Sequence, residues 1–315
     1  MYYNTISLVI VQYGHMDFLL RLIDSLKRHE DSSMIDEIVI VNNDVTPLRL
    51  ELGTLPTIPL RVLCNYNNAY ATAVNQGVAL SAGEIVVVAN NDIMWSSWPV
   101  LRSLLKELNS KEDVGVVGPQ LVYPDGTWQR SYGYFPSIKE GIMGCLMLDF
   151  LVYLLRRYFF RLNRWRAGSY EVEYVDGAFM VIRRKCWEEL GGFDESFKFY
   201  AEDADFCFRA WKKGWKVIFV PEARVIHFRG ATSMSSKETA RKYLELLIQA
   251  KRQFVQKHYG TCITKWYMKL MEISTYERMI LYHLCRWLTK SEWLNEKAFR
   301  MRLQLEAIKS LKEEI

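Results

Sequence analysis

Apolar and polar residues alternate along the first 120 residues as short apolar runs separated by amphipathic stretches. The apolar runs are rich in β-branched residues and predict buried strands, at 6–12, 37–41, 60–63 and 84–89. The amphipathic stretches carry apolar residues every three or four positions and predict helices, at 16–28, 71–80 and 100–108. Strands that alternate with helices in this way indicate an α/β fold, in which helices cover both faces of a mainly parallel, Rossmann-like sheet.

The second half of the chain has a different pattern. Two more strands are predicted at 174–183 and 215–220, with a helix at 203–213 between them, whereas residues 138–170 are aromatic and basic and interrupt the α/β pattern as an insertion. Beyond Ser233 the whole chain has helical periodicity. We therefore expect an α/β domain over residues 1–235 and a helical C-terminal tail over residues 236–315.

Polar clusters follow three of the predicted strands, at 42–44, 65–68 and 90–92. In parallel sheets covered by helices, ligands bind beyond the carboxyl ends of the strands. A carboxylate at such an end, as at Asp92, is suited to hold a divalent cation that neutralises a diphosphate. The alternative for Asp92 is an ordinary turn or helix N-cap, where Asn and Asp are common.

Three carboxylates lie within four residues at Glu202, Asp203 and Asp205, just before a predicted helix. Their mutual repulsion has a cost unless a cation, a proton or the helix N-terminus offsets it. One such carboxylate, held in place, is able to take a proton from an attacking hydroxyl. The alternative is an acidic first helical turn. His227 ends a strand-like run and is either a buried core imidazole or, if it converges with Asp92 and the acidic cluster, a ligand.

The net charge of +5 is unevenly distributed. Residues 151–170 hold five Arg and no acid, and residues 236–315 hold sixteen Lys and Arg against nine Asp and Glu. Because these segments also carry Leu, Phe, Tyr and Trp, they resemble helices that lie on anionic lipid more than surfaces for nucleic acid, which we do not expect as a partner. The six cysteines form no CxxC pair, which argues against zinc and disulfides and favours a reducing cytoplasm.

The insertion is the clearest candidate for contact with lipid. Apolar residues recur in it at helical spacing, with arginines around them: Leu151, Leu154, Leu155, Phe159 and Leu162, then Arg156, Arg157, Arg161 and Arg164. The alternatives are a core-packing helix with snorkelling arginines, or contact with a second subunit. The same alternatives hold for the aromatic residues of the tail, Trp266, Tyr267, Tyr282, Trp287 and Trp293. The N-terminus has no pattern of a secretory signal, and no apolar run approaches the roughly 20 residues that span a bilayer.

Several motifs, in this order and spacing, resemble glycosyltransferase family 2, which has the GT-A fold. They are IVIVNND at 38–44, NNAYATAVNQG at 67–77, NND at 90–92, GAFMVIRR at 177–184, GGFD at 191–194, YAEDADFCFR at 200–209, and VPEA at 220–223 followed by His227. The resemblance covers residues 6–231. The first loop, Tyr13-Gly14-His15, and the Asn-x-Asp loop are most similar to the rhamnosyltransferase-like branch, which uses a deoxythymidine-diphosphate sugar.

The resemblance implies a role for each matching residue. Asp203 would be the general base, and Mg²⁺ or Mn²⁺ would be held by Asp92 with Asn90 and His227. The nucleotide-sugar would be bound within residues 1–120, by Asn42, Asn67, Asn75 and Asn91. The acceptor would be bound within residues 121–235, by Asp176, Glu202 and Asp205.

The implied activity is inverting transfer of a sugar, with rhamnose as one candidate, from a UDP- or dTDP-linked donor to a hydroxyl of a glycan or polyprenyl-diphosphate-linked acceptor. Such an enzyme would serve cell-surface polysaccharide synthesis at the cytoplasmic face of the cell membrane, either as a peripheral protein or as a homodimer. The alternatives are a sugar nucleotidyltransferase and a non-catalytic nucleotide-sugar-binding protein. The first normally has a glycine-rich, basic loop after the first strand, and Gln12-Tyr13-Gly14-His15 fits that poorly.

Overall fold

The computed structural model describes residues 4–48, 58–64, 69–161, 168–228, 237–289 and 292–312. Contacts divide the chain into two compact units. Unit 1 comprises residues 1–134, 160–198 and 202–229, and unit 2 comprises residues 135–159, 199–201 and 230–315. Most of the segment predicted as an insertion therefore belongs to the same unit as the C-terminal helices.

Unit 1 is built on a nine-stranded sheet, whose strands in the described residues run in the order β3-β2-β1-β4-β10-β6-β11-β5, with β8 beside β11. The strands are β1 (Ile6–Gln12), β2 (Glu37–Asn42), β3 (Leu60–Cys64), β4 (Ile85–Asn90), β5 (Ile93–Met94), β6 (Val114–Val122), β8 (Tyr170–Glu171), β10 (Phe179–Arg183) and β11 (Lys216–His227). Strands β1 to β4 are parallel, as predicted, whereas β10, β5 and β8 are antiparallel to their neighbours. A separate ribbon pairs β7 (Tyr132–Gly133) with β9 (Tyr174–Val175).

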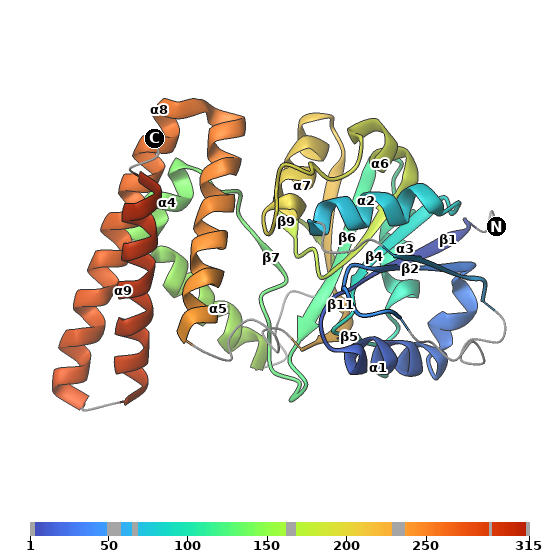
Figure 1. The fold of residues 1–315 in the computed structure, drawn as a ribbon, viewed down its shortest axis with the longest axis horizontal. Coiled ribbons are helices and arrows are strands. Elements are labelled where there is room, and N and C mark those ends of the chain that lie inside the picture. Colours follow the sequence, from blue (N-terminus) through green and yellow to red (C-terminus); the bar gives the residue numbers. More distant parts are fainter. Residues whose placement is uncertain are drawn as a thin grey trace. The chain divides into compact units, whose positions relative to one another are not determined.

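Helices cover both faces of this sheet, as the sequence predicts. They are α1 (Met16–Lys27), α2 (Tyr70–Leu80), α3 (Leu101–Leu108), α6 (Arg184–Leu190) and α7 (Glu202–Lys212), with a 3-10 turn at Glu30–Met34. Alternate side chains of β1 point to opposite faces of the sheet. Leu8 and Ile10 share a core with α1 and α3, whereas Val9 lies against α2. Figure 1 accordingly shows α1 on one side of the sheet and α2 on the other.

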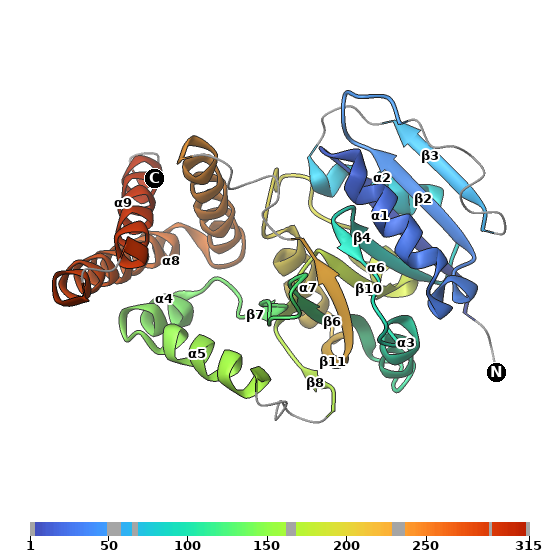
Figure 2. The same cartoon turned by 90° about the horizontal axis from the view of Figure 1, so that it is seen from below.

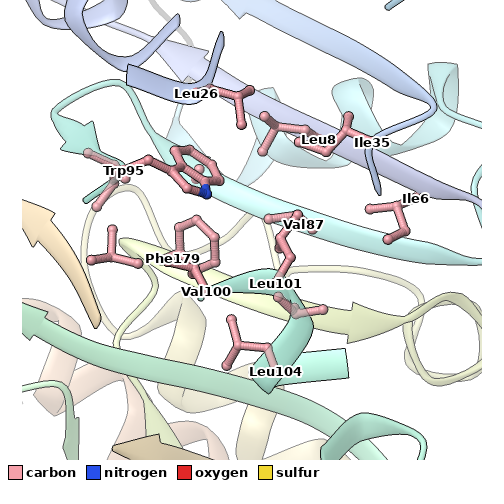
Figure 3. Close-up of a cluster of buried hydrophobic side chains, with 14 of the residues drawn as sticks. Ile6, Leu8, Leu26, Ile35, Val87, Trp95, Val100, Leu101, Leu104 and Phe179 are labelled. Atoms are coloured by element: carbon pink, nitrogen blue, oxygen red, sulfur yellow. The ribbon is translucent and has the colours of Figure 1, made fainter. Parts of the chain in front are cut away.

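A hydrophobic core lies between the sheet and helices α1 and α3 (Figure 3). Two aromatic rings pack within it: Trp95 contacts Phe179 edge-to-face, with 5.4 Å between the ring centroids. Leu101 and Leu104 of α3 are fully buried against the same cluster. This core fixes β4, and with it the turn after Asn90, where the chemistry is predicted.

A close approach of helix α2 to the sheet makes Gly77 sensitive to substitution. A Cβ at Gly77 of α2 would lie 2.5 Å from Cγ1 of Val9 and 2.9 Å from Cγ2 of Val41. We expect Gly77→Ala to lower the free energy of unfolding by about 1–3 kcal/mol, because the helix must shift off the sheet. Urea denaturation measures this.

The matched control is Gly144→Ala, in another helix, where the nearest atoms to the added Cβ lie at 3.4 Å. That change is expected to be neutral or stabilising by up to about 1 kcal/mol, from the better helix propensity of alanine. Equal midpoints for wild type and Gly77→Ala would show that α2 does not pack this closely.

Unit 2 is helical and consists of α4 (Ile138–Cys145), α5 (Leu148–Arg161), α8 (Lys237–Thr289) and α9 (Glu292–Lys312). Helix α8 changes direction at Gly260, whose φ of 81° is not helical, and α9 packs along it (Figure 2). Small residues let α4 approach α8, since Gly144 faces Ser274. Arg278 then binds both carboxylate oxygens of Asp149, at 2.7 and 2.8 Å.

Most of the residues predicted to contact lipid lie in unit 2, and those that the structure describes differ in exposure. Leu151, Leu154 and Leu155 of α5 are exposed, as are Trp266 and Trp287, whereas Tyr267 is buried and donates a hydrogen bond to Glu140. Leu162 and Arg164 lie outside the described residues, as do the side chains of Arg156, Arg157, Phe159, Arg161 and Trp293. Among the described residues, no helix is both long and apolar enough to cross a membrane.

The observed elements differ from the predicted ones in two places. The strand predicted at 174–183 is broken into β9 and β10, because Asp176 and Gly177 form a turn in which Asp176 accepts a hydrogen bond from the amide of Ala178. The strand predicted at 215–220 continues as β11 to His227. The extension matters because it carries His227 to the edge of β5.

Candidate active site

Two neighbouring strands bring Asp92 and His227 together. Asp92 lies in the tight turn between β4 and β5, and β11 pairs antiparallel with β5 so that His227 is opposite Ile93. The Oδ1 atom of Asp92 is 3.3 Å from Nε2 of His227. The convergence that the sequence left open is therefore present for these two residues.

A glutamine side chain orients the His227 ring through Nδ1. The side-chain NH₂ of Gln129 donates to the backbone carbonyl of His227 at 3.2 Å, so its Oε1, which lies 2.6 Å from Nδ1 of the ring, is an acceptor. Nδ1 therefore carries a hydrogen, and Nε2 faces Oδ1 of Asp92 at 3.3 Å. A lone pair on Nε2 would repel this oxygen unless a proton or a cation lies between them.

These donors suit a divalent cation. Asn90 ends β4, and its side-chain Oδ1 is buried without a hydrogen-bond partner, which has a cost that coordination would remove. Mg²⁺ typically takes one or two carboxylates from the protein and completes its shell with water and phosphate oxygens. In keeping with so open a site, no three His, Cys, Asp or Glu side chains of the described residues form a closed metal cage. Asp92, His227 and Asn90 are thus the residues that would hold the ion.

The acidic cluster starts α7, and each of its members has different surroundings. Asp203 accepts a hydrogen bond from the amide of Gly177 at 2.8 Å, so that one of its oxygens is held against the turn before β10. A Cβ at Gly177 would lie 3.1 Å from that of Asp203, which explains why a glycine fits here. Asp176 lies one residue before this glycine, so it belongs to the same turn.

Glu202 is buried, and its Oε2 has no hydrogen-bond partner. Burial, together with the nearby carboxylates of Asp203 and Asp176, raises the pKa of Glu202 to about 8, although a backbone hydrogen bond lowers it. Glu202 is therefore protonated at neutral pH. A neutral Glu202 leaves less negative charge around Asp203 than three ionised carboxylates would.

Tyr70 joins the two halves of the site, and the sequence patterns did not single it out. Its hydroxyl donates to the carbonyl of Gly177 at 3.3 Å. Burial raises the pKa of Tyr70 well above its usual value, and four carboxylates add to the effect: Glu202, Asp203, Asp176 and Asp92. One hydroxyl thus lies within electrostatic range of both the acidic cluster and Asp92. Its only sequence signal was its place in the NNAYATAVNQG motif.

The raised pKa of Glu202 predicts a pH-dependent stability. Below pH 4.5 the residue is protonated in both the folded and the unfolded chain, whereas between pH 4.5 and about 8 the unfolded chain releases the proton and the folded one keeps it. Wild type therefore loses stability as the pH rises through this window. Because glutamine resembles the protonated form, we expect Glu202→Gln to be the more stable protein at pH 9, by at most about 5 kcal/mol.

Urea midpoints of both proteins across this pH range measure the effect. The two curves are expected to meet near pH 4 and to separate above it, since every other titrating group is shared. Parallel curves at all pH values would show that Glu202 is ionised in the folded protein.

The predicted nucleotide-binding asparagines hold loops of the site. Asn42 is buried and donates to the carbonyl of Thr46, and Asn91 donates to Gln12 and to the carbonyl of Tyr13. Each thereby braces a loop at the carboxyl end of the parallel strands. Asn67 lies outside the described residues.

Asn75 and Asp205 both support the turn at Gly191 and Gly192. Asn75 donates to the carbonyl of Phe193 and accepts from its amide, both at 2.9 Å. Asp205 is fully buried and bonded to Arg209 at 2.8 Å, and Arg209 donates in turn to the carbonyl of Gly192. These contacts point to positioning of the turn that precedes α7, and binding of donor or acceptor by Asn75 or Asp205 stays a prediction.

Known proteins resemble this chain in sequence and in fold. A curated relative, N-acetylglucosaminyl-diphospho-decaprenol L-rhamnosyltransferase of Mycobacterium tuberculosis, is 31% identical over 174 residues, which are 52% of this chain and 56% of the relative. The chain thus spans about half the length of that relative.

Two solved structures share the fold at 16% sequence identity. The mannosyltransferase PcManGT of Pyrobaculum calidifontis, with GDP-Man and Mn²⁺, has a TM-score of 0.58 and covers 98% of this chain and 87% of its own. GalNAc-T7, with UDP, GalNAc and Mn²⁺, has a TM-score of 0.55 and covers 84% of this chain and 56% of its own. Both likenesses confirm the predicted GT-A fold with its flanking helices.

A family model extends the match across both units. The model, described as glycosyl transferase family group 2, matches residues 97–303, which is more than half of the chain. It includes Asp203, His227, Gln129 and most of the helical region. The chain belongs to glycosyl transferase family group 2.

Proposed function

We propose that this protein is an inverting, metal-dependent glycosyltransferase that transfers a sugar from a nucleoside-diphosphate donor to an acceptor hydroxyl. The proposal is supported by the approach of Asp92 to His227 at 3.3 Å and by Tyr70, which lies within electrostatic range of both Asp92 and Asp203. Transfer with inversion needs two such functions: stabilisation of the leaving diphosphate and a base for the attacking hydroxyl.

Different residues would carry out these two functions. Asp92, His227 and Asn90 would hold Mg²⁺ or Mn²⁺, which supplies Lewis-acid stabilisation of the diphosphate. Gln129 keeps the His227 ring in the tautomer that presents Nε2. Asp203 takes the proton of the acceptor hydroxyl as it attacks the anomeric carbon from the side opposite the diphosphate, so the configuration inverts. Asp203 is oriented by the amide of Gly177.

We propose a deoxythymidine- or uridine-diphosphate sugar as the donor, with rhamnose as the first candidate. The relative from M. tuberculosis is named as an L-rhamnosyltransferase acting on a diphospho-decaprenol lipid. We accordingly propose a glycan or a polyprenyl-diphosphate-linked glycan as the acceptor. The reaction then belongs to cell-surface polysaccharide synthesis at the cytoplasmic face of the membrane.

Donor choice is tested by calorimetric titration of the protein with dTDP, UDP and GDP in the presence of Mn²⁺, followed by product analysis with the donor of the tightest nucleotide. The anomeric configuration of the product, measured by NMR, is expected to be opposite to that of the donor. Retention of configuration would overturn the role given to Asp203, because retention requires a different mechanism.

A further inference from the structure

The C-terminal half of α8 carries an apolar stripe on its exposed face. We call this set the outer stripe: Trp266, Ile273, Tyr276, Ile280, Leu284 and Trp287, all of which are exposed. Their spacings of seven, three, four, four and three residues place them on one side of the helix. At 1.5 Å per residue the outer stripe is about 30 Å long.

The outer stripe is not part of the packing of unit 2. Ser274 and Thr275 are buried on another face of α8, where Gly144 of α4 approaches Ser274 and Gln304 of α9 donates to Thr275. Both neighbouring helices therefore pack on the other side of α8. Leu284 is 57% exposed and Trp287 is 80% exposed, which is unusual for such large apolar side chains on a water-facing helix.

The charges beside the outer stripe are positive. Between Thr261 and Trp287, the exposed side chains with a permanent charge are Lys265, Lys269 and Arg286. The two acids of the segment are half-buried: Glu272 is bonded to Lys312 at 2.7 Å and lies 3.5 Å from Lys269, and Glu277 has a buried oxygen. An apolar face with cations on its rim is complementary to anionic lipid.

A second copy of the chain fits this surface less well. Most homodimers are two-fold symmetric, so the same patch would face itself. The cations beside the outer stripe would then approach the cations of the partner, and the described part of the stripe offers no exposed acid to balance them. An anionic lipid surface satisfies the apolar and the charged side chains together.

Helix α5 of the same unit has a similar face. Leu148, Leu151, Leu155 and Tyr158 are exposed at spacings of three, four and three residues. Two of the five arginines of residues 151–170, Arg156 and Arg157, belong to unit 2 and add positive charge to α5.

We propose that unit 2 docks on an anionic lipid surface through the outer stripe of α8, with its Trp, Leu and Ile side chains at the acyl boundary and the flanking cations at the headgroups. The proposal rests on the proposed function for its purpose, which is access to a lipid-linked acceptor. Lipid binding itself needs no donor, metal or acceptor.

The experiment is sedimentation of the full chain with phosphatidylcholine vesicles, with and without phosphatidylglycerol, in the absence of nucleotide-sugar. Wild type is expected to bind the phosphatidylglycerol vesicles more tightly, and less tightly as salt is added. The double variant Leu284→Glu/Trp287→Glu is expected to bind at least about tenfold more weakly, from the loss of buried apolar surface. Because both positions are exposed, the variant should keep the wild-type circular dichroism spectrum.

The matched control is Trp211→Glu on α7 of unit 1, where the tryptophan is 58% exposed, and it is expected to bind vesicles like wild type. Equal binding of wild type and the double variant overturns the proposal. So does a wild-type dimer, seen by sedimentation velocity and lost in the double variant, when wild type binds no vesicles; that outcome assigns the outer stripe to a second copy. Failure of sugar transfer with intact vesicle binding would overturn the proposed function alone.

Discussion

Replacing Asp203 with asparagine is expected to lower kcat for sugar transfer by about 10²–10⁴-fold, the range that a positioned general base contributes. Asparagine has the shape of aspartate and is still able to accept the hydrogen bond from Gly177. It has no carboxylate to take the acceptor proton. The loss should therefore appear in kcat, with donor affinity close to that of wild type.

The control for this variant is Asp24→Asn, an exposed carboxylate on α1 that pairs with Arg28. It should leave kcat unchanged. The pH profile adds a second readout, because removal of the base should flatten the acidic limb of the profile of kcat. An Asp203→Asn variant with wild-type turnover would contradict the assignment of the base.

Replacing Asp92 with asparagine is expected to lower kcat/KM by about 10²–10³-fold, equivalent to about 3–4 kcal/mol of transition-state stabilisation. The change removes the negative charge beside Nε2 of His227 and with it one ligand of the proposed ion. More Mn²⁺ should therefore be needed for half-maximal activity. Steady-state kinetics over a Mn²⁺ titration measures both effects.

Asp125→Asn is the matched control for Asp92, since Asp125 is an exposed turn carboxylate of the same unit that accepts from the amide and hydroxyl of Thr127. Its metal dependence should equal that of wild type. If Asp92→Asn shows the same metal dependence as wild type, Asp92 is not a ligand.

The sheet and its helices were predictable because their patterns are local. The strand at Ile6–Gln12 and the helix at Met16–Lys27 follow from hydrophobic periodicity alone, and the structure agrees with both within one residue. The continuity of β11 was less predictable, because the sequence suggested one strand to Val220 and a separate strand-like run that His227 ends. Pairing with β6 to Ile226 and with β5 to His227 joins them into one strand, and such pairing between distant segments has no local signal.

The site was predictable in its residue types and less so in its contacts. Motif positions singled out Asp92, Asp203 and His227, but the approach of Asp92 to His227 depends on strand register. The sequence patterns did not identify Gln129 and Tyr70, because neither is a charged residue or a common metal ligand. Gln129 contacts His227, and Tyr70 contacts the carbonyl of Gly177. Asn42 was predicted to bind nucleotide and does lie at the carboxyl end of a parallel strand, but its side-chain amide donates to the carbonyl of Thr46 in its own loop.

The raised pKa of Glu202 gives the acidic cluster a physical explanation. In the sequence, three carboxylates lie within four residues, and their mutual repulsion must be offset by a cation, a proton or the helix N-terminus. In the structure, Glu202 is neutral at pH 7, Asp205 is paired with Arg209, and Asp203 alone keeps a carboxylate held by Gly177. The three acids thus differ in their surroundings: Glu202 is a buried neutral group, Asp205 belongs to an ion pair, and Asp203 is the proposed base.

The central claim is that Asp92, His227 and Asp203 form one transferase site, and release of nucleoside diphosphate tests it most directly. The protein is incubated with dTDP- and UDP-sugars, with and without a synthetic lipid-linked acceptor, in Mn²⁺ and again with chelator. We expect release from one donor, which requires both acceptor and metal and which Asp203→Asn slows by about 10²–10⁴-fold. Release that is undiminished by chelator, or equally fast in Asp203→Asn, would contradict it.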